Sequence, residues 1–244
     1  MRIIGIIPAR YGSTRFEGKP LINILGKTMI QRTYEQAKKS ELIEEVYVAT
    51  DDERIKQNAE SFGAQVIMTS KECACGTDRI AEAVQQLGLS DNDLVVNIQG
   101  DEPVVNPSSI DAAIKPFLSD PTLKVTTLAI KIKNALEYSD PSVAKVVTDK
   151  DGFALYFSRA GIPYNRSNHT EVYKQLGIYV FRKHFLVEFS KMKPTRYELT
   201  EKLEQLRIIE NGHKIKVVET DYDSPSINVP ADLDTVLDFL KKGK

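Results

Sequence analysis

The sequence predicts an α/β protein with a Rossmann-like, mixed but mainly parallel sheet and helices on both of its faces. Short apolar runs alternate with helical patterns through the first half of the 244-residue chain. These runs are apolar throughout, which is typical of strands covered on both faces. Polar residues follow several of the runs directly, where parallel strands present their carboxyl ends to a ligand.

The expected elements of the first half are five strands with helices between them. The strands are Ile3–Ile7, Val46–Thr50, Ala64–Thr69, Leu94–Ile98 and Val125–Ile132. Apolar residues at helical spacing from Met29, Ile55, Ile80 and Ile110 predict the helices. Thr50 and Glu53 have the spacing of a capping box, and Gly63 and Gly88 stand where helices are expected to end.

The pattern changes after about residue 140 into an expected β-hairpin followed by further strands and helices. Two apolar runs flank the four-residue turn Asp149–Gly152, as in a hairpin. The expected elements are strands Lys145–Thr148, Phe153–Phe157, Gly177–Phe181 and Ile215–Glu219 and helices Lys183–Met192, Glu198–Asn211 and Ala231–Lys241. We expect a single domain over 1–244, with an elaboration at about 140–210. Because an apolar hairpin needs a partner surface, a homodimer is expected.

Composition excludes several classes of protein. Lys and Arg number 33 against 34 Asp and Glu, for a net charge of -1, so there is no basic surplus for non-specific binding to nucleic acid. Cys73 and Cys75 are too close for an unstrained disulfide and indicate reduced thiols in a cytoplasmic protein. No apolar run approaches the ~18 residues of a membrane helix, and the first run leads into Arg10 rather than into a signal-peptide cleavage site.

The stretch Pro8–Pro20, PARYGSTRFEGKP, predicts an anion site at the end of the first strand. It offers backbone N–H groups and positive charge, which suit a polyphosphate. Five residues separate Gly12 from Gly18 and Pro20 follows Lys19, so the stretch is not a Walker A loop. The alternative is a solvated basic loop between two elements.

Asp101 is the first candidate for chemistry, in VNIQGDEP after the fourth strand. A lone Asp after a strand is commonly a turn residue. Here a basic glycine loop is expected at the same edge of the sheet. Mg²⁺ prefers one or two carboxylates together with phosphate oxygens. We therefore expect Asp101 to hold Mg²⁺ while Lys19 and Arg10 neutralise phosphates.

Seven segments, in order along almost the whole chain, closely resemble the 3-deoxy-manno-octulosonate (Kdo) cytidylyltransferase family: PARYGSTRFEGKPL, VATDD, CGTDRIAEA, VNIQGDEP, ALYFSRAGIPY, LGIYVFR and LEQLR. Sugar nucleotidyltransferases share the first segment broadly, whereas the last three are more specific. The resemblance implies a fold of the nucleotide-diphospho-sugar transferase type and a cytoplasmic homodimer with its hairpin at the dimer contact. It also implies Mg²⁺-dependent transfer of CMP from CTP to the anomeric hydroxyl of Kdo, with release of diphosphate, for lipopolysaccharide synthesis.

The resemblance also assigns site residues. For the nucleotide they are Ala9, Arg10, Gly12, Ser13, Arg15, Lys19, Gly76, Thr77, Arg79 and Asp101, with Lys19, Asp101 and Arg10 catalytic. For the sugar acid they are Gln99, Arg159, Gln175, Tyr179, Glu204 and Gln205. Two of these have local alternatives, because Thr77 suits a helix N-cap and Arg159 suits an ion pair beside the hairpin. Gln175 replaces a histidine of many family members, so no histidine base is required there.

The expected metal ligands are Asp101 and Asn228. The family pattern V-D-x-P-x-D-L has an acid where this chain has Asn228, and an uncharged amide predicts weaker metal binding. Asp232, the later acid, is expected to cap the last helix. Two alternatives stay open, namely transfer to another acid sugar such as a sialic acid or a modified Kdo, and a non-catalytic nucleotide-binding module. Retention of Lys19, Arg10 and Asp101 argues against the module.

Overall fold

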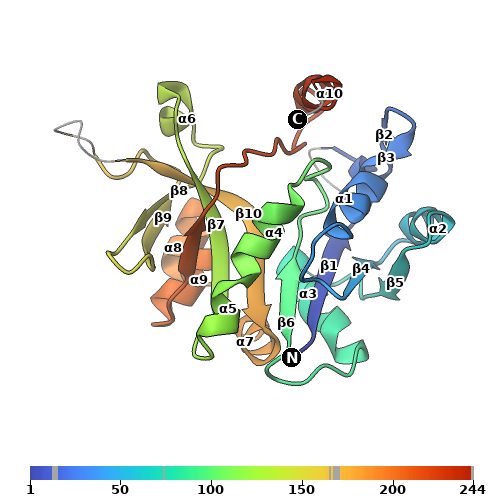
Figure 1. Ribbon diagram of the computed structural model, residues 1–244, viewed down its shortest axis with the longest axis horizontal. Coiled ribbons are helices and arrows are strands. Elements are labelled where there is room, and N and C mark those ends of the chain that lie inside the picture. The colour runs from blue at the N-terminus through green and yellow to red at the C-terminus, as the bar shows by residue number, and fades with distance from the viewer. Residues whose placement is uncertain (13–15, 74, 165, 167–170, 243–244) are drawn as a thin grey trace.

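The computed structural model describes residues 1–12, 16–73, 75–164, 166 and 171–242, and within them nine strands form one mixed sheet (Figure 1). Its main path runs in the order β11-β7-β10-β6-β1-β4-β5, and β8 joins β10 and carries β9. The strands are β1 (Ile3–Ala9), β4 (Glu45–Thr50), β5 (Gln65–Met68), β6 (Leu94–Asn97), β7 (Val125–Lys131), β8 (Lys145–Thr148), β9 (Ala154–Ser158), β10 (Tyr173–Arg182) and β11 (Lys216–Glu219). A separate two-stranded sheet pairs β2 (Asn23–Ile24) with β3 (Lys27–Thr28).

The sheet is mainly parallel, with one long antiparallel strand inside it. β1 pairs in parallel with β4 and β6, β4 with β5, and β7 with β11. β10 runs antiparallel to β6 and β7, which places Tyr179 beside Asn97 and Thr127. A register shift leaves Gly177 and Ile178 as a bulge in β10. The predicted fold class is confirmed.

Helices cover both faces of the sheet. Successive side chains of a strand point to opposite faces, and in these strands the side chains on both faces are apolar. Ile3 and Ile7 of β1 pack on the face that carries α1 (Met29–Ala37), α2 (Glu53–Ser61), α4 (Pro107–Ile114) and α5 (Pro116–Ser119). Ile4 and Ile6 pack on the face that carries α3 (Gly76–Ala83), α7 (Lys183–Ser190) and α9 (Gln205–Glu210). Figure 1 shows α4 and α5 in front of the sheet.

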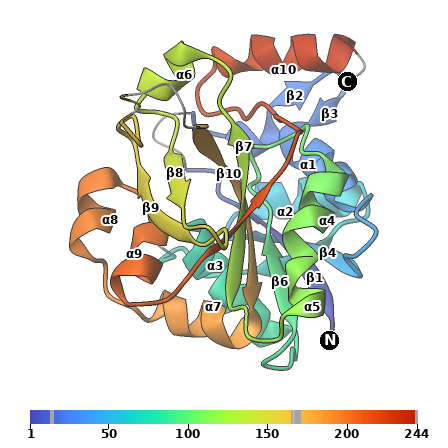
Figure 2. The same ribbon diagram turned by 60° about the vertical axis from the view of Figure 1, so that its left-hand side comes forward.

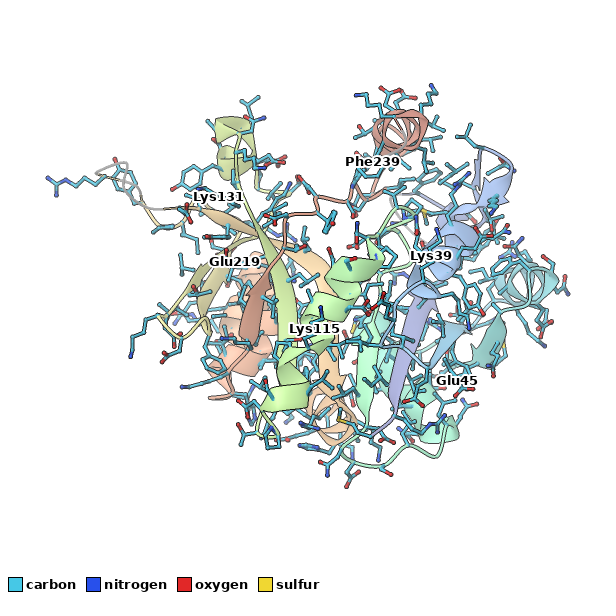
Figure 3. The ribbon with its side chains drawn as sticks, viewed as in Figure 1. Lys39, Glu45, Lys115, Lys131, Glu219 and Phe239 are labelled. Carbon is cyan, nitrogen blue, oxygen red and sulfur yellow. The ribbon has the colours of Figure 1, made fainter. Side chains whose placement is uncertain are left out.

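A third, smaller apolar cluster brings the C-terminal segment to the carboxyl edge of the sheet. It joins Ile24 of β2, Met29, Ile227 and Val236 of α10 (Asp232–Lys241). Phe239 of α10, labelled in Figure 3, packs against it. Figures 1 and 2 both show α10 on the side of the molecule that carries β2 and β3.

Two short 3₁₀ helices and two short α-helices complete the described elements: η1 (Lys19–Leu21), η2 (Val84–Gln86), α6 (Ala135–Ser139) and α8 (Arg196–Glu201). The expected hairpin is present as β8 and β9, and its turn forms because Asp149 accepts hydrogen bonds from the backbone N–H groups of Asp151 and Phe153. Among the described residues, no helix is long and apolar enough to cross a bilayer.

Two expectations about helices were wrong and two were confirmed. The predicted helix Glu198–Asn211 is interrupted, because Lys202 adopts a left-handed conformation between α8 (Arg196–Glu201) and α9. Thr50 does not cap α2; it ends β4, and the side chain of Asp52 caps the helix instead. Gly63 and Gly88 lie just beyond the ends of α2 and η2 with φ of +81° and +59°, as helix C-terminal glycines do.

Candidate active site

A cavity of about 280 Å³ lies at the carboxyl ends of β1 and β6. The predicted residues that line it are Ala9, Arg10, Lys19, Gly76, Arg79, Gln99 and Asp101. Met29, Cys73, Cys75 and Gly100 also line it, and none of them was predicted as a site residue. Ser13 and Arg15 lie outside the described residues, so their predicted roles stay predictions.

Two glycines let three chain segments meet around this cavity. A Cβ at Gly100 would lie 2.9 Å from the carbonyl oxygen of Pro8, and one at Gly76 would lie 3.2 Å from the Pro8 ring. The turn after β6 and the start of α3 can therefore lie directly against the end of β1. Backbone amides at the start of α3 are consequently close to the basic residues of the loop after β1.

Lys19 and Asp101 form a half-buried ion pair in the cavity. Lys19 Nζ donates to Asp101 Oδ2 at 2.8 Å and to the carbonyl oxygen of Ile227 at 2.9 Å. The backbone N–H of Ile227 in turn donates to the Asp101 carbonyl at 2.9 Å. Lys19, predicted to bind phosphate, thus contacts Asp101, predicted to bind the metal. Ile227 of the C-terminal segment is hydrogen-bonded to both residues.

Asn228 follows Ile227 in the chain but is not among the residues that line the cavity. Its Nδ2 donates to Ser226 Oγ at 3.1 Å. Asp232 accepts hydrogen bonds from the backbone N–H groups of Asn228 and Val229, and it lies inside α10, whose N-cap is Ala231. The expectation that Asp232 caps the last helix was therefore wrong, because its carboxylate holds the preceding turn.

The oxygen donors of Asp101 and Asn228 fit a hard cation better than a soft one. Among the described residues, no three His, Cys, Asp or Glu side chains group as a metal cluster. Mg²⁺ does not need such a cluster, since it commonly takes one or two carboxylates and completes its shell with phosphate oxygens and water. The Asp101 carboxylate and the Asn228 amide oxygen are donors of that kind.

Arg79 lines the cavity but is already paired. Its guanidinium lies 3.1 Å from Asp51, which follows β4, and it also donates to the Thr69 hydroxyl and the Ser70 carbonyl. Its side chain is only 4% exposed. Arg79 thus links α3 to the ends of β4 and β5. Through these contacts it positions the start of α3, which carries Gly76 and Thr77.

Tyr11 and Arg54 hold the ends of the basic loop, and the sequence did not indicate this pair. The Tyr11 carbonyl accepts a hydrogen bond from Gly18 N–H at 3.0 Å. The Arg54 guanidinium lies 3.3 Å from the centre of the Tyr11 ring, and Asp52 holds Arg54 in turn. Gly18 needs its φ of +67°, where other residues are strained. No local pattern links Tyr11 to a helix that begins more than forty residues later.

A hydrogen-bonded polar network joins α3, β10 and α9. Thr77 Oγ1 donates to Glu204 Oε1. Gln205 Nε2 donates to Gln175 Oε1 at 2.8 Å, and Gln175 Nε2 donates to the Tyr179 hydroxyl at 2.8 Å. Four residues predicted for the sugar acid therefore gather with one predicted for the nucleotide.

Burial shapes the chemistry of this network. It raises the pKa of Glu204, although hydrogen bonds from Thr77 and Cys75 oppose the shift. Burial also raises the pKa of Tyr179 well above its ordinary value. Thr77 is not the N-cap of α3, because the Cys75 side chain occupies that position and accepts from Asp78 N–H at 3.4 Å. Apart from the carboxyl group of Glu204, the network consists of amides and hydroxyls, unlike the Lys19–Asp101 corner.

Cys73 and Cys75 line the cavity as thiols. Burial raises the pKa of Cys73 to about 11 and that of Cys75 to about 12. Since the nucleophilic form of cysteine is the thiolate, these values support the expectation that neither residue acts as a nucleophile. Both are half-buried.

Arg159 is not among the residues that line the cavity. Its Nε donates to the Glu201 carbonyl at 2.7 Å, and its terminal nitrogens donate to the carbonyls of Pro141 at 2.9 Å and Lys202 at 3.3 Å. Within the described part of the chain, Arg159 makes these carbonyl contacts and not the ion pair that was the expected alternative. The Arg159 carbonyl itself accepts from the buried Lys145 at 2.7 Å. Contact between Arg159 and a sugar carboxylate stays a prediction.

Three kinds of comparison relate this chain to known proteins. The sequence profile of the family described as "Cytidylyltransferase" matches residues 4–215. The 3-deoxy-manno-octulosonate cytidylyltransferase of Geotalea uraniireducens (strain Rf4) is 49% identical over 254 residues, which is 99% of this chain and 100% of the relative. The 3-deoxy-manno-octulosonate cytidylyltransferase 2 of Hydrogenovibrio crunogenus (strain DSM 25203 / XCL-2) is 50% identical over 248 residues, which is 100% of each chain.

Solved structures agree. A CMP:2-keto-3-deoxy-manno-octonic acid synthetase in complex with CTP superimposes with a TM-score of 0.94 at 39% identity over 100% of each chain. The 4-diphosphocytidyl-2C-methyl-D-erythritol synthase from Anaerococcus prevotii DSM 20548 has a TM-score of 0.59 at 16% identity over 98% of each chain. The second likeness concerns the fold alone.

Proposed function

This chain belongs to the 3-deoxy-manno-octulosonate cytidylyltransferase family, and we propose that it transfers CMP from CTP to the anomeric hydroxyl of Kdo, releasing diphosphate. The observation that supports this most directly is the cavity at the carboxyl ends of β1 and β6, where Lys19, Arg10 and Asp101 gather; the polar network around Gln175 lies on the neighbouring strand β10. One region suits a triphosphate and the other suits sugar hydroxyls. The product would supply lipopolysaccharide synthesis.

The reaction we propose is a direct in-line displacement. The anomeric oxygen of Kdo forms a bond to the α-phosphorus of CTP and gives its proton to water, while the bond from that phosphorus to the oxygen that bridges it to the β-phosphorus breaks and diphosphate leaves with the electron pair. Such transfers depend on positioning and on stabilisation of charge. Lys19 and Arg10 would bind the phosphate oxygens and stabilise the charge on diphosphate.

We propose Mg²⁺ as the cofactor, held by Asp101 and Asn228. Bound there, it would supply positive charge to the phosphate oxygens. Lys19 donates a hydrogen bond to Asp101 in this structure. When CTP binds, Lys19 would donate to the phosphate oxygens instead of to the Asp101 carboxylate. The remaining nucleotide ligands are proposed as Ala9, Gly12, Ser13, Arg15, Gly76, Thr77 and Arg79.

The sugar acid would be held by Gln99 and the network of Gln175, Tyr179, Glu204 and Gln205. Amides and hydroxyls of this kind can both donate to and accept from sugar hydroxyls. Arg159 remains the proposed ligand for the carboxylate, because an arginine can bind a carboxylate with two hydrogen bonds. To do so it must exchange contacts such as those with the Glu201 and Pro141 carbonyls.

We further propose one domain over 1–244 that works as a cytoplasmic homodimer, with the elaboration at about 140–210 serving sugar binding and dimer contact. The dimer is supported by large apolar side chains on β9 and α8, since Leu155 is 58% exposed and Leu199 is 54% exposed. Free thiols at Cys73 and Cys75 fit a reducing compartment. Light scattering on the purified protein measures the dimer directly.

A diphosphate-release assay with CTP, Mg²⁺ and a panel of acid sugars tests the proposed reaction. Release with Kdo is the expected result, and its loss on chelation of Mg²⁺ tests the cofactor. Release only with a sialic acid or a modified Kdo would show that the chain is a cytidylyltransferase for a different acid sugar. Binding of CTP without release for any sugar would contradict catalysis and leave the nucleotide-binding module.

A further inference from the structure

The turn after β6 is wedged between two other strands. On one side, Gly100 lies so close to β1 that a Cβ would stand 2.9 Å from the Pro8 carbonyl. On the other side, a Cβ at Gly177 in the bulge of β10 would stand 2.5 Å from Glu102 Oε1. The turn therefore fits between β1 and β10 only because positions 100 and 177 are glycines, which have no side chain.

Glu102 fixes this turn through both its backbone and its side chain. Its backbone N–H donates to the Gln99 carbonyl at 3.2 Å, and its carbonyl accepts from Val105 N–H at 3.1 Å. Its buried carboxyl group packs directly against the backbone of Gly177, where an added Cβ would lie 2.5 Å from Glu102 Oε1. Glu102 is the contact through which the turn reaches the bulge of β10.

The two parts joined by this contact carry different halves of the candidate site. The turn presents Gln99 and Asp101 to the cavity. The bulge separates Gln175 from Tyr179 along β10, and both side chains belong to the polar network. A shift at the contact would consequently change the distance between the phosphate-side and sugar-side groups.

We propose that Glu102 is a positioning residue, docked on Gly177, which sets Asp101 and Gln99 relative to the network on β10. Glu102 does not line the cavity, so it acts through its neighbours and not on the substrates. The inference rests on the proposed function, because it assigns Asp101 to the phosphates and the network to the sugar acid. Displacements of about 1 Å at such groups cost up to about 10²-fold in rate.

Four variants test this contact. Glu102→Gln keeps the size of the side chain that packs on Gly177 and should retain activity within about twofold. Glu102→Ala removes this side chain, and Gly177→Ala pushes a methyl group against the carboxyl and against Gln99 Cγ, which lies 2.9 Å from the added Cβ; each should lower kcat by about tenfold or more. In the double variant Glu102→Ala/Gly177→Ala the clash with the carboxyl is gone and only the approach to Gln99 remains, so the loss should be smaller than the product of the two single losses.

The readouts are kcat, the KM for each substrate, the affinity for CTP by calorimetry, and the thermal unfolding temperature, with rates taken well below unfolding. Gly5→Ala is the matched control. It adds a methyl group to β1 within 3.2 Å of Ile43, so it should lower stability and leave kcat and KM unchanged.

If the factors by which Glu102→Ala and Gly177→Ala lower kcat multiply in the double variant, the two positions act independently, which would overturn the proposed contact. Lower unfolding temperatures with native kcat and KM would also overturn it, because Glu102 would then support the fold alone. If the native chain bound CTP but used no acid sugar, the proposed function would fail separately. The coupling between positions 102 and 177 would still be measured through CTP affinity, where unchanged affinity in every variant would overturn the positioning role.

Discussion

The two halves of the candidate site are built in opposite ways. The phosphate side consists of charged groups around a half-buried ion pair, whose side chains are 13% exposed at Lys19 and 24% exposed at Asp101. The sugar side consists of amides and hydroxyls linked through Gln175, with one enclosed acid, Glu204, that accepts from Thr77 beside them. The phosphate side can exchange its internal ion pair for a charged ligand, whereas the network is already satisfied before any ligand arrives.

Because of this difference, we expect the phosphate side to contribute mainly to the strength of binding and the sugar side mainly to the choice of ligand. Charges near the surface attract a polyphosphate of almost any nucleotide, because they depend little on exact geometry. A buried network rejects a ligand that leaves one of its polar groups unpaired, at a cost of about 1–3 kcal/mol per group. We therefore expect changes on the phosphate side to affect turnover and changes on the sugar side to affect recognition.

The largest effect is expected from Asp101→Asn. The variant keeps the size of the side chain but removes the charge that would hold Mg²⁺ and that now pairs with Lys19. Turnover should fall by about 10²-fold or more, as when one electrostatic stabiliser of a transition state is lost. The measurement is diphosphate release at saturating Mg²⁺. Asp120→Asn, in the turn before β7, is the control and should keep its rate; a native rate for Asp101→Asn would remove this residue from the mechanism.

A smaller and more selective effect is expected from Gln205→Met. Methionine has a similar length but cannot donate to Gln175 Oε1, so Gln175 loses one of the hydrogen bonds that orient it. At about 1.4 kcal/mol for each factor of ten, loss of this bond should raise the KM for Kdo by about tenfold and leave the KM for CTP unchanged. Gln57→Met on the exposed face of α2 is the control. Equal changes in both KM values would argue against a separate sugar side.

The smallest effect concerns Glu204 and pH. Burial raises the pKa of Glu204 above its ordinary value, so the folded chain binds this proton more tightly than the unfolded chain. The stability from this group is complete below the ordinary pKa, about 4.3, and is lost as pH rises through the raised pKa. Urea unfolding between about pH 5 and pH 8 should therefore show a smaller loss of stability in Glu204→Gln than in the native chain.

The control for this comparison is Glu60→Gln on the exposed surface of α2, which should keep the native dependence on pH. A tenfold difference in proton affinity between the folded and the unfolded chain corresponds to about 1.4 kcal/mol, which careful unfolding curves can resolve. An unchanged slope in Glu204→Gln would show that this carboxyl group does not titrate differently in the folded chain.

Local sequence pattern predicted much of the fold but misjudged where elements end. Glu198–Asn211 has helical spacing throughout, yet Lys202 breaks it, because packing of Leu203 and Leu206 into the core requires α9 to change direction. Thr77 suited an N-cap in its sequence, but Cys75 takes that position and leaves the threonine hydroxyl free to reach Glu204. In both cases a contact from another part of the chain outweighed a local preference.

Local patterns were enough to predict the alternation of apolar strands and helices, the basic glycine loop Pro8–Pro20 and the candidate acid Asp101, because burial and turn formation leave a trace in neighbouring residues. Which side chains meet depended on contacts between distant parts of the chain. Lys19 pairs with Asp101 across 82 residues, and Thr77 reaches Glu204 across 127. The contact of Glu102 with Gly177 likewise exists only because β10 is inserted antiparallel between β6 and β7. The order of strands in a sheet is a long-range property, set by the packing of both faces at once, and no local spacing records it.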